Sequence, residues 1–158
     1  MAEYDLQSVP LDTADVRIAV VAARFNHDIT DALLEGALRV LHAHDIADDD
    51  LHVMRVPGAF ELPLAAKRLA QSGRFDVVIT LGAVVRGGTP HFDYVCTECA
   101  RGVMQVSIEE SLPVIFGVLT TDDMAQALDR VGGAHGHKGE EAALAALETL
   151  SALKAVPR

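Results

Sequence analysis

The sequence predicts an α/β fold, a three-layer α/β/α sandwich in which helices cover both faces of a four-stranded parallel sheet. Short runs that are apolar on both faces alternate with segments whose apolar residues repeat at helical spacing. The chain has 158 residues, half of them hydrophobic and 23% charged, which suits one domain with a proper core. No linker, low-complexity segment or solenoid repeat interrupts this alternation.

The first strand-helix pair follows a short N-terminal segment. Residues 16–22 (VRIAVVA) are β-branched and apolar, which is typical of a buried parallel strand. After a turn at 24–26, residues 27–46 predict an amphipathic helix. Its apolar stripe consists of Ile29, Leu33, Ala37, Leu38 and Leu41.

The second pair begins with residues 51–56 (LHVMRV), a strand that the Pro-Gly pair at 57–58 ends. A helix follows, and Pro63 is tolerated in its first turn because no intrahelical hydrogen bond is lost there. We expect Leu64, Leu69 and Ala70 to face the core of the protein.

The third pair consists of a strand at 75–81 (FDVVITL), a glycine-rich loop at 82–91 and a helix that runs to about Glu110. These assignments place the loop immediately beyond the carboxyl end of the strand.

The last strand is expected at 113–119 (PVIFGVL). Thr121, followed by two aspartates, predicts the N-cap of a short helix that ends near Val131. The sequence GGAHGHKG breaks this helix, and an alanine-rich helix at 140–154 closes the chain.

The charge balance excludes one class of partner. The chain has 23 acidic and 13 basic residues and a formal net charge of −10, so we expect no binding to nucleic acid, which requires a basic surface. The apolar runs are far shorter than the ~20 residues that span a bilayer, and the first residues lack the apolar core of a signal peptide. We therefore expect no membrane association and a cytoplasmic protein.

Residues 1–14 are expected to form an N-terminal arm, and residues 15–158 a single domain. The arm has Pro10 and scattered acids but no clear period. An open four-stranded sheet has two edges that can pair with another chain, and an arm is a suitable partner for a neighbour's edge. The sequence therefore favours a homo-oligomer.

Ligands of open parallel sheets bind beyond the carboxyl ends of the strands. The turn Arg86-Gly87-Gly88-Thr89 lies there, before a predicted helix, where backbone N–H groups can converge on an anion. A tight turn without a ligand needs glycine equally, so this motif alone leaves both interpretations open. Neither GxxxxGK[ST] nor GxGxxG is present, so a nucleoside triphosphate or a dinucleotide is not expected.

His91 follows this turn, and histidine is the side chain best suited to proton transfer near neutral pH. A histidine that only caps a helix is the alternative, but its place beside the anion turn favours the chemical role. Arg130 and Lys138 flank the last loop and can supply cations to a phosphate. Alternatively, Arg130 stabilises a helix C-terminus and Lys138 is an ordinary surface charge.

Three phenylalanines lie at or near strand ends, Phe25, Phe60 and Phe116, and each is either a stacking surface for a planar ligand or part of the core. For Phe60 we favour the core. Glu61 either orients a ligand or caps the second helix. The cysteines at 96 and 99 form C-x-x-C without further metal-ligand spacing and are interpreted as ordinary thiols.

Five motifs then form a recognisable set. They are FN at 25–26, VPGAFELP at 56–63, LGAVVRGGTPHFDYVC at 81–96, PVIFGVLT at 113–120 and HKGEEAA at 137–143. Together they resemble the 6,7-dimethyl-8-ribityllumazine synthase family of riboflavin biosynthesis, in the family's order and spacing from Val16 to Lys154. The resemblance implies a flavodoxin-like fold and the condensation of 5-amino-6-(D-ribitylamino)uracil with 3,4-dihydroxy-2-butanone 4-phosphate, without a metal or organic cofactor.

The resemblance also implies a role for each motif. His91 would be the proton donor and acceptor. The ring and ribityl chain would contact Phe25 with Asn26, the segment Ala59, Phe60 and Glu61, and the strand end Ala83, Val84 and Val85. The phosphate would contact Gly88, Thr89 and Arg130, while Phe116 would close the pocket and Lys138 would lie near it.

In the family the pocket lies between adjacent subunits, with Phe116 and Arg130 supplied by the neighbour. The resemblance thus implies a homopentamer, as one ring, two rings or an icosahedral shell, and the short last loop favours the shell. Riboflavin synthase is a further candidate partner.

The chain departs from the family pattern at His137, where asparagine is common, at Ala83, where threonine is frequent, and in the run GGAHGH, which is less basic than usual. Three alternatives remain from the residues alone: a non-catalytic flavin or lumazine carrier, a receiver-type signalling domain and a purely structural shell protein. The receiver requires an aspartate where this chain has LGAVVRGG.

Overall fold

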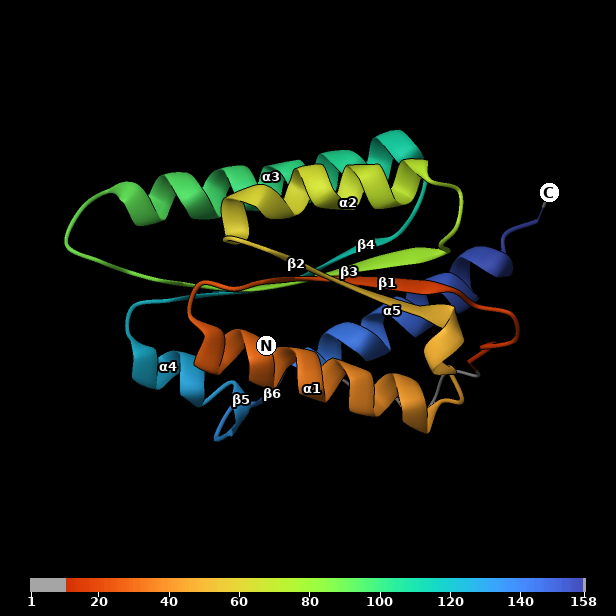
Figure 1. Cartoon of the computed structure of the whole chain (residues 1–158), viewed down its shortest axis with the longest axis horizontal. Helices are drawn as coiled ribbons and strands as arrows, with labels where there is room; N and C mark the ends of the chain where they lie inside the picture. The colour runs from red at the N-terminus through yellow and green to blue at the C-terminus, as the bar shows by residue number, and fades with distance from the viewer. Residues whose placement is uncertain (1–10, 158) are drawn as a thin grey trace.

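A computed structural model describes residues 11–157 of the chain. Its main sheet has four parallel strands in the order β2-β1-β3-β4, with helices on both faces (Figure 1). The strands are β1 (Ile18–Ala23), β2 (Leu51–Val56), β3 (Val77–Val85) and β4 (Val114–Thr121). The helices are α1 (His27–Ala43), α2 (Leu62–Gln71), α3 (His91–Glu110), α4 (Met124–Leu128) and α5 (Lys138–Lys154), with 3-10 turns η2 (Asp48–Asp50) and η3 (Ala59–Glu61). The expected three-layer α/β/α sandwich is confirmed.

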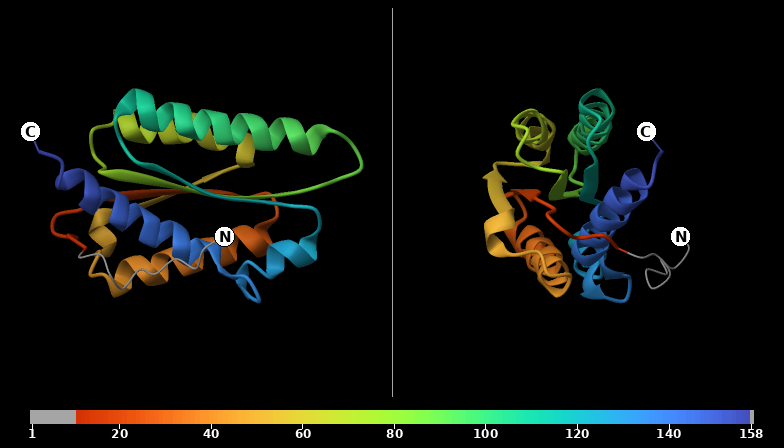
Figure 2. Two further views of the ribbon diagram at one scale, coloured as in Figure 1. Left: turned by 180° about the vertical axis from the view of Figure 1, so that it is seen from behind. Right: turned by 90° about the vertical axis from the view of Figure 1, so that its right-hand side faces the viewer.

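The central strand β1 shows why an apolar run without alternation becomes a parallel strand here. All six of its residues are buried, because it pairs with both β2 and β3 and is covered by helices on each face. Helices α1 and α5 lie on one face of the sheet, and α2 and α3 lie on the other (Figure 2). Ile18 and Val20 pack with the α1 and α5 layer, whereas Ala19 and Val21 pack with the α2 and α3 layer. Fully burying one such branched side chain contributes about 1.5–3 kcal/mol, so β1 anchors both halves of the core.

Strand β3 is longer than the sequence pattern predicts. The expected loop at 82–91 was wrong in its first part, because Gly82 to Val85 continue the strand and pair with Val118 to Thr121 of β4. Pairing with β1 ends earlier, at Leu81. The last four residues of β3 therefore extend beyond β1 and are joined to the sheet through β4 alone; we call them the β3 extension. A glycine followed by hydrophobic residues resembles a loop until the partner strand is known.

The buried face of α2 differs in part from the expected one. Leu64 does not face the core and is 70% exposed. Because the helix begins at Leu62, its buried face repeats through Leu62, Ala66, Leu69 and Ala70, and position 64 lies outside this stripe. The inward assignments of Leu69 and Ala70 are confirmed.

The segment after β4 differs in detail from the prediction. Thr121 is the last residue of β4 rather than a helix cap, and Asp123 caps α4 by accepting a hydrogen bond from the Gln126 N–H at 2.8 Å. The glycine-rich run forms a hairpin of β5 (Val131–Gly133) and β6 (Gly136–His137). Helix α5 begins earlier than expected because His137 Nδ1 accepts from the Glu140 N–H, as asparagine can at a cap.

Most of the expected N-terminal arm, residues 1–10, lies outside the described residues. Its last part contacts the domain: Leu11 packs against the α1 and α5 side of the core. The Asp12 N–H donates to the Ser151 hydroxyl of α5 at 3.0 Å.

Helices α1 and α5 approach each other through glycine. A Cβ added at Gly139 would overlap the carbonyl group of Leu33, with the carbonyl carbon only 2.8 Å away. One at Gly36 would overlap the His137 ring, with Nδ1 at 2.6 Å. These two contacts fix the start of α5, and hence Lys138, against α1.

We predict that Gly139→Ala destabilises the protein. Alanine would gain about 1 kcal/mol of helix propensity over glycine, but the overlap is with backbone that cannot move aside, and overpacking costs about 3 kcal/mol. The net expectation is a loss of about 2 kcal/mol in the free energy of unfolding, measured by urea denaturation. Gly87→Ala is the control, since an added Cβ there has no neighbour within 4 Å. Equal stability of the two variants would contradict the close approach.

Candidate active site

Two separate cavities contain most of the predicted site residues, one at the carboxyl edge of the sheet and one along its edge strand β4. The first, of about 590 Å³, lies between the ends of β1 and β3, the η3 turn and the start of α3, and we call it the β3 cavity. The second, of about 410 Å³, lies along β4 beside α5 and is called the β4 cavity. In Figure 1 the β1–α1 turn, the β3–α3 turn and α4 are all at this end of the molecule.

The β3 cavity brings together most of the residues that the sequence singled out. Its lining includes Phe25, Ala59, Phe60, Glu61, Ala83, Val84, Val85, Thr89 and His91. Gly88 belongs to the same turn, between the lining residues Gly87 and Thr89. The imidazole of His91 and the glycine turn thus face one cavity with apolar and aromatic walls, which is suited to a flat ligand that carries an anionic group.

Asn26 does not line the β3 cavity, but it supports Ala83, which does. It adopts a left-handed conformation, with φ 60° and ψ 50°, just before α1. Its side-chain Nδ2 donates to the Ala83 carbonyl oxygen at 2.8 Å. That carbonyl belongs to the β3 extension, which β1 no longer pairs, so the Asn26 amide substitutes for a missing strand neighbour. Asparagine suits both tasks, because it tolerates φ above zero and carries a donor.

The η3 turn determines how Phe60 and Glu61 are presented. The Gly58 N–H donates to Glu61 Oε2 at 2.9 Å, so this carboxylate caps the η3 turn and not the second helix, α2, to which it makes no capping hydrogen bond. Phe60 is 58% exposed and lines the β3 cavity, so its expected place in the core was wrong. The turn buries Ala59 instead and directs the ring outward. Phe25, 72% exposed, lies in the same cavity.

The glycine turn has backbone donors to offer. Among residues 11–157, no hydrogen-bond partner is found for the N–H groups of Gly87, Gly88 or Thr89. Thr89 Oγ accepts a long hydrogen bond from the His91 N–H, at 3.4 Å. The turn leads into α3, a helix of 20 residues whose N-terminal dipole favours an anion. The arrangement can hold a phosphate close to the imidazole.

The remaining three predicted residues line the β4 cavity and do not reach the β3 cavity within one chain. Phe116 is half-exposed on β4. Arg130 Nη1 donates to the Gln126 carbonyl oxygen at 2.8 Å, so within the chain it stabilises the end of α4, as its alternative interpretation required. Lys138 Nζ pairs with the Glu141 carboxylate at 2.8 and 3.0 Å. Sequence reasoning groups all strand ends, but the β3 extension lies between these two sets.

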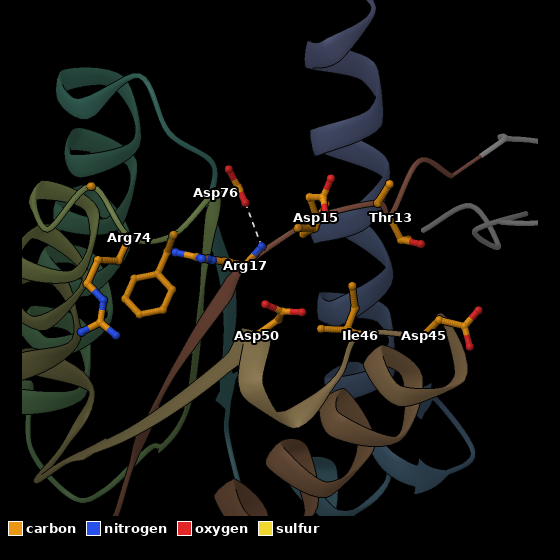
Figure 3. Close-up of a pocket in the computed structure, with 12 residues that line it drawn as sticks. Thr13, Asp15, Arg17, Asp45, Ile46, Asp50, Arg74 and Asp76 are labelled. Atoms are coloured by element: carbon orange, nitrogen blue, oxygen red, sulfur yellow. Dashed lines mark hydrogen bonds between the residues drawn. The ribbon is translucent and has the colours of Figure 1, made fainter.

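A cavity larger than either of these lies elsewhere, at the amino ends of the strands (Figure 3). It has about 730 Å³ and is lined largely by charged side chains, among them Asp15, Arg17, Asp50, Arg74 and Asp76. The Arg17 N–H donates to Asp76 Oδ2 at 2.7 Å. None of the predicted site residues lies there, and parallel sheets place their ligands at the opposite edge, so cavity size does not identify the site.

The cysteines are unsuited to nucleophilic chemistry. Burial is the main cause that raises the pKa of Cys99 to about 12, and it also raises the pKa of the half-buried Cys96. A thiol is reactive as its thiolate, which both environments disfavour. No group of three or more His, Cys, Asp or Glu side chains that could hold a metal ion occurs in residues 11–157. Over the same range, no helix is long and apolar enough to cross a membrane.

The deciding comparison is with a protein-family model. The model described as 6,7-dimethyl-8-ribityllumazine synthase matches residues 15–154. The chain belongs to this family. The resemblance drawn from the sequence motifs is thereby confirmed, as are the flavodoxin-like fold and the enzyme class, a transferase of riboflavin biosynthesis.

The β3 cavity of this lumazine synthase family member also has lining residues that sequence reasoning missed. They are Phe92, Tyr94 and Val95; Gly87, in the turn that the sequence singled out, and Gly58, at the end of the second strand, also line it. Tyr94 and Val95 follow His91 at helical spacings of three and four, so they share its face of α3. That spacing would have revealed them, once His91 was taken as the first residue of the helix.

We predict that Asn26→Ala lowers the free energy of unfolding by about 2 kcal/mol, through a lost hydrogen bond and left-handed strain. Asn26→Gly keeps the backbone conformation at less cost and should lose only about 1 kcal/mol. Chemical denaturation of both variants measures the difference. Wild-type stability in both would show that the amide does not support the β3 extension.

Proposed function

We propose that this chain condenses 5-amino-6-(D-ribitylamino)uracil with 3,4-dihydroxy-2-butanone 4-phosphate, giving 6,7-dimethyl-8-ribityllumazine, phosphate and water. The observation that carries the proposal is that His91 and the Gly87–Thr89 turn line one cavity with two exposed aromatic rings. Family membership supports the same reaction. The proposal needs no metal or organic cofactor, because each step moves protons and exchanges bonds between the two substrates.

The pyrimidine ring would stack on Phe25, an exposed ring at the mouth of the cavity. Ala83, Val84 and Val85 would line the other side of the ring. Ala59, Phe60 and Glu61 would hold the ribityl chain, whose hydroxyls suit the exposed turn.

The reaction begins when the amine of the pyrimidine attacks the ketone, and loss of water gives an imine. Removal of a proton from the carbon next to the imine carbon then allows phosphate to depart by elimination. The enol that remains takes a proton at its terminal carbon and becomes a ketone. The ribityl-bearing nitrogen attacks this ketone and closes the second ring with loss of another water. His91 would take and return protons in these steps, and holding both substrates in register lowers the barrier further.

The phosphate would bind to the N–H groups of Gly88 and Thr89 and to the Thr89 hydroxyl. One cation beside it would complete the site, and we assign that role to Arg130 of a neighbouring subunit, with Phe116 closing the pocket and Lys138 nearby. The support is that these three residues gather in the β4 cavity, apart from His91, in each chain. Two half-sites on one chain require a second copy to complete either of them.

We further propose that the chain, as a single domain over residues 15–158, assembles as a homopentamer in the cytoplasm and that pentamers form an icosahedral shell. Exposed aromatic rings in both cavities support burial between subunits. The short last loop, a two-residue connection between β5 and β6, leaves the outside of such a ring free of insertions. Riboflavin synthase, which would consume the product, remains a candidate partner.

We predict that His91→Ala lowers kcat by about one to three orders of magnitude, because proton transfer contributes that much, while assembly is unchanged. The measurement is appearance of the absorbing, fluorescent pteridine after the two substrates are mixed, with mass photometry as the control for assembly. A wild-type rate would end the assignment of His91. Tight binding of the pyrimidine without any turnover by the wild type would instead indicate a carrier.

The shared site predicts complementation between inactive chains. Arg130→Ala should raise KM for the phosphate substrate more than for the pyrimidine, because it removes a cation from the anion site. When His91→Ala and Arg130→Ala chains are co-expressed, random mixing leaves about a quarter of the sites with both side chains intact. At concentrations of the phosphate substrate well below the raised KM, where both variants alone are nearly inactive, activity should therefore recover to about a quarter of the wild-type rate. A mixture no more active than the average of the two variants would show that each site belongs to one chain.

A further inference from the structure

Arg86 lies directly before the glycine turn but is not part of the β3 cavity lining. Its N–H donates to the Thr121 carbonyl oxygen at 2.9 Å, which carries the β3–β4 ladder beyond Val85. Its guanidinium makes two ion pairs, from Nε to Asp122 Oδ1 at 3.0 Å and from Nη1 to Asp93 Oδ1 at 3.3 Å. Its Cζ also lies 4.3 Å from the centroid of the Phe92 ring.

These contacts join three segments at one point. Asp93 is in the first turn of α3, two residues after His91, and Phe92 lines the β3 cavity. Asp122 follows β4, on the path to α4 and the β4 cavity. The guanidinium thus links the end of β3 to the start of α3 and to the exit from β4.

The turn between these anchor points is held weakly by its own residues. Gly87 and Gly88 have no side chains, and an added Cβ on either would have no neighbour within 4 Å. The Thr89 hydroxyl contributes one long hydrogen bond. The distance from the free N–H groups of the turn to His91 is therefore set by the segments on either side of the turn. Arg86 joins these segments, because it precedes the turn and its guanidinium bonds to Asp93 in the first turn of α3.

We propose that Arg86 is a positioning residue that clamps the Gly87–Thr89 turn against the start of α3, so that a phosphate bound to the turn is held in register with the His91 imidazole. This inference rests on the proposed function for the identity of the anion. Exposed ion pairs contribute little to folding, and all three partners are partly exposed. The clamp therefore acts on substrate placement rather than on global stability.

The geometry requires arginine rather than a positive charge alone. The planar guanidinium reaches two carboxylates from different nitrogens while it stacks on the Phe92 ring. The acidic partners, Asp122 foremost, raise the pKa of Arg86, which agrees with a permanent charge at this position. Lysine offers a single ammonium on a flexible chain and can satisfy only part of this set.

The kinetic test compares Arg86→Gln and Arg86→Lys with Arg39→Gln, a control that removes the Arg39–Glu140 ion pair between α1 and α5. Arg86→Gln should raise KM for the phosphate substrate about tenfold and lower kcat to a similar extent, because misplacement weakens both binding and alignment. KM for the pyrimidine should stay within about twofold, and Tm should match that of Arg39→Gln. Arg86→Lys should recover part of the loss.

A second readout does not depend on turnover. Hydrogen exchange of the segment 87–95 is measured with and without inorganic phosphate. Phosphate should slow exchange in the wild type and in Arg39→Gln but not in Arg86→Gln. If Arg86→Gln matches the control in both kinetics and exchange, or if KM rises equally for both substrates with a fall in Tm, the clamp is refuted. If the wild type forms no pteridine, the proposed function fails, and the exchange experiment still decides on the clamp.

Discussion

The unequal pairing of β3 is the constraint on which the site depends. One edge of this strand is paired with β1 only as far as Leu81, whereas the other follows β4 to Val85. This difference produces the β3 extension, in which the backbone of β3 continues beyond the end of its pairing with β1. On the side that β1 leaves unpaired, the Asn26 side chain donates to the Ala83 carbonyl oxygen. On the side of β4, the Arg86 N–H adds one more hydrogen bond to the ladder, to the Thr121 carbonyl oxygen. The β3 extension determines the position of one wall of the β3 cavity. It also determines the positions of the Gly87–Thr89 turn and of the start of α3.

The β3 extension also separates the two cavities of one chain from each other. The β3 cavity, with its aromatic walls and the His91 imidazole, lies on the side of α3. The β4 cavity, with Arg130 and Lys138, lies on the side of α5. Within the chain, Arg130 and Lys138 already have partners of their own, a helix carbonyl and a carboxylate. In the shared site that we propose, these contacts would hold both side chains in place before a ligand binds, which would limit the entropy lost on binding.

The sequence predicted what local pattern determines. The buried strands, the helix before residue 46 and the residues that follow strand ends were recognisable because burial and turns have direct signatures. The length of β3 was not, because its last four residues look like a loop until residues 118–121 are placed beside them. The prediction for Phe60 was wrong because the sequence did not reveal the short 3-10 turn η3. In this turn Ala59 is buried and Phe60 is exposed. The separation of Arg130 from His91 also follows from strand register, which a single sequence does not specify.

The β3 extension also limits how this chain can change in length. Ala83 and Val85 pack toward the α1 and α5 layer, whereas Val84 packs toward the α2 and α3 layer. Because neighbouring strand residues point to opposite faces, losing one residue there would send the side chains that follow it in the strand into the wrong layer. It would also put Arg86 opposite Thr121 in place of Val85, and Gly87 at the position from which Arg86 now donates its N–H to the Thr121 carbonyl oxygen. The four residues before Arg86 are therefore a segment in which the chain cannot gain or lose a residue without disturbing both the packing of the two helix layers and the ladder to β4.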